Sequence, residues 1–197
     1  MPDDTRHLNG AAVRDLLSVA TLLKDPQLAG LYAHLYLEEP ATVREATAAL
    51  DFSRETTQRL LSRLEEMGTV ETITDAGTQQ YRATTIELSL SASQGEGIYT
   101  VTPALIDAVG RRSEDGDIDT YIDRHGIAGL ATALTYAVAR ARGETTHRLM
   151  ARDLDISPLA AEIVLQALRP VVDEHFDVEA SGGSLEDVTD EDTTNDA

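Results

Sequence analysis

The 197-residue sequence predicts a mainly helical protein that contains a small β-hairpin. Two observations support this fold class. Apolar residues recur with the helical period of 3.6 residues over most of the chain, whereas an alternating pattern follows at residues 69–90. In addition, the helical pattern of the first half returns in the same order in the second half. We therefore expect two helical units, of which the first carries the hairpin.

The composition narrows the classes of protein to which the chain can belong. The 35 Asp and Glu residues outnumber the 16 Lys and Arg residues, which gives a formal net charge of -19. Because the chain has no cysteine, it has no disulfide, no thiol nucleophile and no cysteine-ligated zinc. It also has no apolar run long enough to span a bilayer and no signal-peptide pattern, so we expect a cytoplasmic protein without a membrane partner.

The charged residues are unevenly spread along the chain. Lys24 is the only lysine among them. The segment 173–197 alone holds ten acidic residues and no Lys or Arg. Diffuse acid with scarce lysine resembles the proteins of salt-in halophiles, particularly haloarchaea; an ordinary acidic protein is the alternative. At molar salt the Debye length is only ~3 Å, so the charge of the face that touches a ligand matters more than the net charge. Net acidity therefore does not exclude DNA binding.

The first two helices are separated by a proline. Residues 1–8 are expected to be frayed, and a helix is expected at 9–25. Asp25-Pro26 ends it, because the residue before proline disfavours the helical region while proline suits a first turn. A second helix follows at 27–39 and stops before Pro40. The apolar residues of the first helix recur at helical spacing and predict one apolar helix face, formed by Val13, Leu16, Leu17, Ala20 and Leu23.

The stretch DFSRETTQRLLSRLEEMG, residues 51–68, has the features of a helix that follows a tight turn. The preceding ATVREATAAL predicts a short extended piece and then a helix from about Val43. Ser53 suits the N-cap, where its hydroxyl accepts a hydrogen bond from a first-turn amide, and Gly68 suits a left-handed C-cap. At 100° per residue, the side that faces the core is formed by Leu60, Leu61 and Leu64.

A change to a two-residue period follows the helix at once. TVETIT at 69–74, the turn DAGT and QQYRATTIELSL at 79–90 predict a hairpin of two strands. The order of three helices and a hairpin, together with SRETTQRLLSRLEEMGTVE, resembles the MarR-, TrmB- and ArsR-like transcriptional regulators of prokaryotes. The resemblance implies a winged helix-turn-helix over residues 26–90. Its recognition helix, 53–67, would lie in the major groove of double-stranded DNA, with a wing at 69–88.

The outward side of helix 53–67 carries the chemistry that reads base edges. Arginine pairs with O6 and N7 of guanine, and glutamine pairs with N6 and N7 of adenine. Side chains in the first two turns are expected to reach bases, whereas Arg63, Arg44 and Arg82 are expected to contact the DNA backbone. An ordinary solvated helix face is the alternative. The predicted DNA-binding residues are Arg44, Ser53, Arg54, Glu55, Thr56, Gln58, Arg59, Ser62, Arg63 and Arg82.

The second half repeats the first in a degenerate form. A connector with a short strand and a helix is expected at 91–117, of which 91–97 is flexible, and a helical domain at 118–176. Within that domain IAGLATALTY aligns with LAGLYAHLYL, and DISPLAAEIVLQAL aligns with DFSRETTQRLLSRL. This predicts a second helix-turn-helix-like unit with helices at 127–141, 146–153 and 158–172. Its third helix is mostly apolar, so we expect an assembly or regulatory domain with a possible protein partner.

Two functions from different classes remain open. The first is a sequence-specific DNA-binding regulator, expected as a homodimer in which helix 9–25 packs across the interface. The second is a tandem winged-helix protein scaffold, similar to the kleisin-binding partner subunits of condensin-type complexes. No catalytic, metal-ligand or cofactor motif is present, so we expect no enzyme and no cofactor. The acidic tail at 177–197 has too little apolar content to fold and is expected to be disordered.

Overall fold

The computed structural model describes residues 4–38, 40–75, 77–91 and 98–177. The predicted flexible connector lies outside these residues apart from Ser91, and so does the predicted tail beyond Asp177. The described chain is mainly helical and contains two small antiparallel hairpins. None of its helices has the length and apolar character needed to cross a bilayer.

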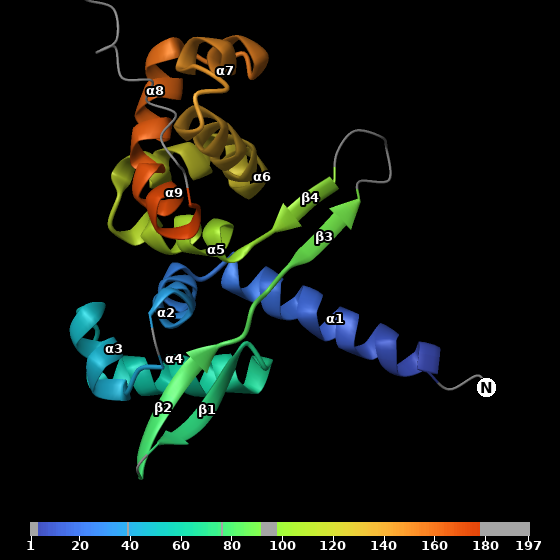
Figure 1. The fold of residues 1–197 in the computed structure, drawn as a ribbon, viewed down its shortest axis with the longest axis vertical. Coiled ribbons are helices and arrows are strands. Elements are labelled where there is room, and N and C mark those ends of the chain that lie inside the picture. The colour runs from blue at the N-terminus through green and yellow to red at the C-terminus, as the bar shows by residue number, and fades with distance from the viewer. Residues whose placement is uncertain (1–3, 39, 76, 92–97, 178–197) are drawn as a thin grey trace, which may run out of the picture.

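The first half of the chain consists of helices and a hairpin, followed by a second hairpin (Figure 1). Its elements are α1 (Asp4–Leu22), α2 (Pro26–Leu37), α3 (Val43–Ala49), α4 (Arg54–Met67), β1 (Val70–Asp75), β2 (Thr78–Ala83), β3 (Leu88–Ser91) and β4 (Ile98–Val101). The second half is helical. Its elements are α5 (Pro103–Gly110), a 3-10 turn (Arg111–Ser113), α6 (Gly116–Ala141), α7 (His147–Asp153), α8 (Pro158–Ala167) and α9 (Arg169–His175).

The predicted first-turn position of Pro26 and the predicted caps of α4 are confirmed. Asp25 caps α2 by accepting a hydrogen bond from the Leu28 amide (3.2 Å), and Pro26 occupies the first helical position. Ser53 caps α4 by accepting from the Thr56 amide (3.1 Å), and Gly68 ends it with φ +72°. The predicted core side of α4 is confirmed as well: its buried residues are Thr57, Leu60, Leu61 and Leu64.

Helix α1 differs from the prediction in its start and in its buried face. It already runs from Asp4, so the prediction of a frayed segment is wrong for residues 4–8, because Asn9 and Gly10 lower helix propensity without ending a helix. The predicted apolar face is not the main buried face: Val13, Leu16 and Leu17 are exposed, whereas Ala20 and Leu23 are half-buried. The other side of the helix, formed by Ser18, Val19 and Leu22, is buried. The Ser18 hydroxyl donates to the carbonyl of Met67, which ties α1 to the end of α4.

The predicted strand 79–90 is broken into two. Residues 78–83 form β2, which pairs with β1 from Val70 opposite Ala83 to Asp75 opposite Thr78. The Thr84 amide still donates to the carbonyl of Thr69, in register with the ladder, and the pairing with the first strand ends there. Residues 84–87 belong to no strand, and residues 88–91 form β3, which pairs with β4. The predicted extended piece after Pro40 is confirmed by the bridge between Ala41 and Tyr81 of β2.

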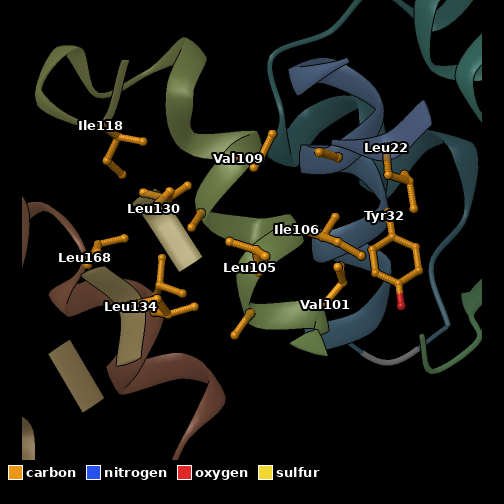
Figure 2. Close-up of a cluster of buried hydrophobic side chains, with 14 of the residues drawn as sticks. Leu22, Tyr32, Val101, Leu105, Ile106, Val109, Ile118, Leu130, Leu134 and Leu168 are labelled. Carbon is orange, nitrogen blue, oxygen red and sulfur yellow. The ribbon is translucent and has the colours of Figure 1, made fainter. Parts of the chain in front are cut away.

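Helix α5, which the prediction placed in a connector, is a buried helix of the core. All its residues from Pro103 to Gly110 are buried. It packs so closely against α2 that a Cβ atom on Gly110 would lie 2.7 Å from the Cα of Gly30. Figure 2 shows the consequence: apolar side chains run without interruption from Leu22 and Tyr32 through α5 to α6 and Leu168. The two halves therefore share one apolar core.

A buried carboxylate reinforces this junction. Asp107 of α5 accepts hydrogen bonds from Arg111 (3.1 Å) and from Nε2 of His175 (3.1 Å). Burial alone would raise the pKa of Asp107, but the hydrogen bonds from His175 and Arg111 outweigh it and hold the pKa below its usual value. The His175 ring also stacks on Tyr36 of α2, with ring centroids 6.0 Å apart. One cluster thus connects α2, α5 and α9.

The helices of the second half follow the prediction in order but differ in their ends. The predicted helix 127–141 is the second part of α6, because Gly126 adopts φ +69° and ψ -178° and kinks the helix there. The predicted helix 146–153 is α7, with Thr146 as its N-cap. The predicted single helix 158–172 is wrong, since α8 ends at Ala167 and α9 begins at Arg169. Pro170 in the first turn of α9 has no amide hydrogen to continue the α8 ladder.

The internal repeat is visible in the backbone. Thr42 and Thr146 cap the second helix of each unit, and Ser53 and Ser157 cap the third. The turn between these helices contains an aspartate with positive φ in both units, +51° at Asp51 and +52° at Asp155. The two units therefore share their helix caps and the left-handed turn between their second and third helices.

Candidate nucleic-acid interface

The turn between α3 and α4 sets how the predicted recognition helix is presented. The Thr47 hydroxyl on α3 and the Thr57 hydroxyl on α4 lie 2.9 Å apart, and the latter also donates to the Ser53 carbonyl (3.1 Å). On α3 a reciprocal capping box joins Thr42 to Glu45, whose carboxylate accepts from the Thr42 amide (2.8 Å). These hydrogen bonds from Thr42 lower the pKa of Glu45 and keep its charge at the start of α3.

The predicted outward face of α4 is confirmed as an exposed face. Its side chains diverge from the core side, which holds Leu60, Leu61 and Leu64. Ser53 is exposed but uses its hydroxyl in the cap, and Thr56 is half-buried beside it. The exposed polar side chains of α4 that the prediction named are Arg54, Glu55, Gln58, Arg59, Ser62 and Arg63.

The predicted arginines fall into two groups according to their partners. Arg63 pairs with Asp25, the cap of α2 (3.3 Å), and Arg82 pairs with Glu71 across the hairpin (3.7 Å). No carboxylate within the described part of the chain pairs with the other three, which are Arg44, Arg54 and Arg59. The guanidinium groups at the start of α3 and in the first two turns of α4 are thus available to an outside ligand.

The hairpin β1–β2 lies beside α4, as Figure 1 shows. Arg82 lies near the base of this hairpin, because its cross-strand partner Glu71 is the second residue of β1. The tip instead presents Thr74, Asp75, Thr78 and Gln79, all exposed. The sequence reasoning missed these tip residues because it searched the hairpin for positive charge alone.

The charge of this region is mixed. Residues 41–83 contain five arginines and seven acidic residues. Several of the acids are already engaged: Glu45 in its capping box, Glu71 with Arg82, and Glu65 with the Thr72 hydroxyl. An anion would therefore meet directed guanidinium and amide groups on α4 rather than a broad positive field.

The equivalent face of the second unit has different chemistry. When Ser157 is aligned with Ser53, Leu159 takes the place of Glu55, and Ile163 takes the place of Arg59. Both apolar side chains are exposed. Glu162, which replaces Gln58, is bound by Arg140 (2.7 and 3.0 Å) and by Gln166, and these hydrogen bonds lower its pKa to about 2. This face offers apolar surface where the first unit offers arginine.

Comparison with known protein families gives a match that covers this second unit. Residues 112–177, about a third of the chain, are similar to a family described as a family of unknown function, DUF7437. No curated protein and no solved structure matches the chain. The matched residues lie entirely in the C-terminal half, so they do not include α3, α4 or the hairpin β1–β2.

Proposed function

We propose that the chain is a DNA-binding transcriptional regulator, in which residues 26–90 act as a winged helix-turn-helix on double-stranded DNA. The observation that supports this most is the outward face of α4, where Arg54, Gln58 and Arg59 are exposed and no described carboxylate pairs with either arginine. These are the side chains that make bidentate contacts to guanine and adenine in the major groove. Helix α4 is the recognition helix in this proposal.

The predicted arginines and Gln58 then have different roles. Arg54, Gln58 and Arg59 reach base edges from the first two turns of α4, while Glu55 and Ser62 lie on the same exposed side. Arg44 contacts a phosphate from the start of α3. Arg63 and Arg82 must give up their ion pairs with Asp25 and Glu71 before they can bind a phosphate, so each contributes less to DNA affinity.

The balance of charge means that contacts to bases contribute more to the proposed DNA binding than contacts to the DNA backbone. Because acids outnumber arginines over residues 41–83, non-specific attraction to the duplex is weak. Few phosphates are neutralised, and the affinity then falls only gently as salt rises, since the salt slope follows the number of phosphate contacts. Such binding suits the salt-rich cytoplasm of a haloarchaeon, which the scarcity of lysine also favours.

A homodimer completes the proposal. Helix-turn-helix proteins commonly read two half-sites, one per protomer. The exposed side of α1, with Val13, Leu16 and Leu17, is an apolar surface of the kind that marks a protein interface. Its position outside the core is what a helix that packs against another protomer requires.

The rival function is a protein-interaction scaffold built from two helix-turn-helix units, without base-specific DNA contacts. Two observations favour it. Arg63 and Arg82 are neutralised by acidic partners, and the second unit exposes Leu159 and Ile163 in place of polar residues. In the scaffold the arginines of α4 would be a solvated surface.

A mobility-shift titration of the full chain against fragments of its own genome, in molar KCl, separates the two functions. The regulator predicts a complex that prefers some fragments and survives excess unrelated DNA. The absence of any preferred fragment, with a circular dichroism spectrum that shows an intact helical fold, would overturn the regulator and leave the scaffold.

A further inference from the structure

A groove of about 570 Å³ lies where the two halves of the chain meet. The described residues that line it come from β4, the start of α5, one side of α6 between Ala131 and Arg142, and the end of α9. They include no residue of α1 or α4, so the groove is separate from the proposed DNA interface. Small-molecule pockets have volumes of about 300–1,000 Å³, and this groove therefore has room for a ligand of that size.

The deeper part of the groove is apolar. Leu105 of α5 and Leu134 of α6 are buried in its lining, and Phe176 is half-buried beside them. Tyr136 adds a second aromatic side chain, whose hydroxyl already donates to the Asp153 carboxylate (3.1 Å). Aromatic and aliphatic side chains of this kind bind the apolar part of a ligand, and aromatic pairs add an attraction beyond the area that they bury. This part of the groove thus favours a large apolar group.

Two opposite charges lie at the exposed edge of the groove. Arg142 and Glu144 both line it, and both are exposed. Within the described part of the chain neither forms an ion pair, with the other or with a third residue. Only Gly143 separates them, so their Cα atoms lie at most about 7 Å apart. A ligand that binds both must therefore have a cation and an anion close together.

The charged edge and the apolar part are within reach of one small molecule. The Arg142 amide donates to the Val138 carbonyl (3.1 Å), which places Val138 one helical turn before Arg142. Leu134 lies one further turn back along the same side of α6. Each turn advances by about 5.4 Å, so an apolar group that starts at the charged edge passes Val138 and approaches Leu134.

We propose that this groove binds an α-amino acid with a large apolar side chain. Arg142 binds the carboxylate, because a guanidinium donates two parallel hydrogen bonds to such a group. Glu144 accepts hydrogen bonds from the ammonium group, and the side chain covers Leu134 and Phe176. One carbon atom bears both charged groups of an α-amino acid, which matches two opposite charges only two residues apart. The inference goes beyond the proposed function and does not depend on DNA binding.

Isothermal titration calorimetry of the full chain without DNA, in constant molar KCl, tests the site with L-phenylalanine as the probe. Two analogues separate its charged groups: 3-phenylpropionate lacks the ammonium, and phenethylamine lacks the carboxylate. Each should bind about tenfold more weakly or worse, because it loses the hydrogen bonds of one charged group. The absence of saturable binding of L-phenylalanine overturns the proposal. So does equal affinity for either analogue, which would show a site for a simple apolar acid or amine.

Variants of the two charged residues identify the groove as the place of binding. Arg142→Gln and Glu144→Gln should each raise the dissociation constant of L-phenylalanine by about tenfold or more. The matched controls Arg124→Gln and Glu66→Gln remove the same charges from exposed helix positions outside the groove, and should leave it unchanged. Circular dichroism checks that all four variants keep their helices.

The analogue without an ammonium group gives the sharpest comparison. Glu144→Gln should not weaken the binding of 3-phenylpropionate, because that ligand has no ammonium for Glu144 to bind. Arg142→Gln should weaken it, since the carboxylate is still present. Wild-type affinity of both variants for L-phenylalanine would overturn the proposal, and so would equal losses in the variants and their controls.

Discussion

The two repeated helical units of this chain differ in what they expose rather than in how they fold. The same capped helices meet at the same left-handed aspartate, and the buried positions of the third helix match: Leu60 with Val164, Leu61 with Leu165, Leu64 with Leu168. On the outward side of the third helix, Arg59 of the first unit corresponds to Ile163 of the second. The comparison indicates that turn and core positions determine the backbone, while the outward positions remain free to specify a ligand. The predictions below challenge that division, from the largest expected effect to the smallest.

The strongest challenge removes equivalent core side chains from each unit. Leu64 and Leu168 are both fully buried. Leu64→Ala and Leu168→Ala should each lower the free energy of unfolding by about 3 kcal/mol, because a truncated buried leucine loses its transfer free energy and leaves a cavity. Denaturant unfolding in constant KCl measures both. Leu159→Ala is the control, and at its exposed position it should change stability by less than about 0.5 kcal/mol. A negligible loss in Leu168→Ala would mean that the second unit lacks a core comparable to the first.

The junction between the units is the next target. Gly110→Ala would place a methyl group 2.7 Å from both the Cα and the amide nitrogen of Gly30. Since both atoms belong to the backbone, α2 and α5 must separate, and overpacking of this kind costs about 1–3 kcal/mol. Gly116→Ala is the matched control, because a Cβ there meets nothing within 4 Å. Equal stabilities of the two variants in thermal unfolding would show that the close approach is not needed to join the halves.

The sequence predicted the units well and their junction poorly, for a physical reason. Caps, prolines and apolar periods depend on residues that are close in sequence. The caps Ser53 and Gly68 and the turn at Asp155 can therefore be recognised from the sequence. The close contact between Gly30 and Gly110 depends on residues far apart in sequence, and nothing local marks either glycine. Helix α5 was consequently assigned to a connector.

The candidate site shows the same limit. The helical period correctly separated the exposed side of α4 from its buried side. It could not reveal that Arg63 pairs with Asp25, because these residues belong to different helices. It also misjudged α1, where two apolar sets, Val13 with Leu17 and Val19 with Leu22, compete for the core. Only tertiary packing decides between such faces.

Measurements of DNA affinity test whether the outward positions of the third helix account for the difference between the two units. Arg59→Ala should weaken specific binding by about 1–3 kcal/mol, the cost of losing one bidentate base contact, without changing the melting temperature. Arg148→Ala is the control. It removes the same charge from the second unit, at the position that corresponds to Arg44, and should leave affinity within about twofold. Titration of a labelled preferred duplex measures both. Equal losses would mean that overall charge, not the face of α4, governs binding.

The smallest expected effect concerns the turn that the two units share. An L residue at positive φ is strained by roughly 1–2 kcal/mol, although aspartate tolerates this region better than most residues. Glycine removes the strain but loses about 0.5–1 kcal/mol to the greater freedom of the unfolded chain. The two terms nearly cancel, so Asp51→Gly and Asp155→Gly should each change the free energy of unfolding by about 0.5 kcal/mol or less.

The valine variants reveal whether the left-handed conformation is required at both turns. Asp51→Val and Asp155→Val place a β-branched side chain at φ +51° and +52°, where it is a conformational outlier. Each should lose roughly 1–2 kcal/mol relative to its glycine counterpart, and by the same amount in both units. Chemical denaturation of the four variants provides the comparison. If valine were tolerated at Asp155 but not at Asp51, the second turn could relax to negative φ. The backbone of the second unit would then be held by its buried residues alone.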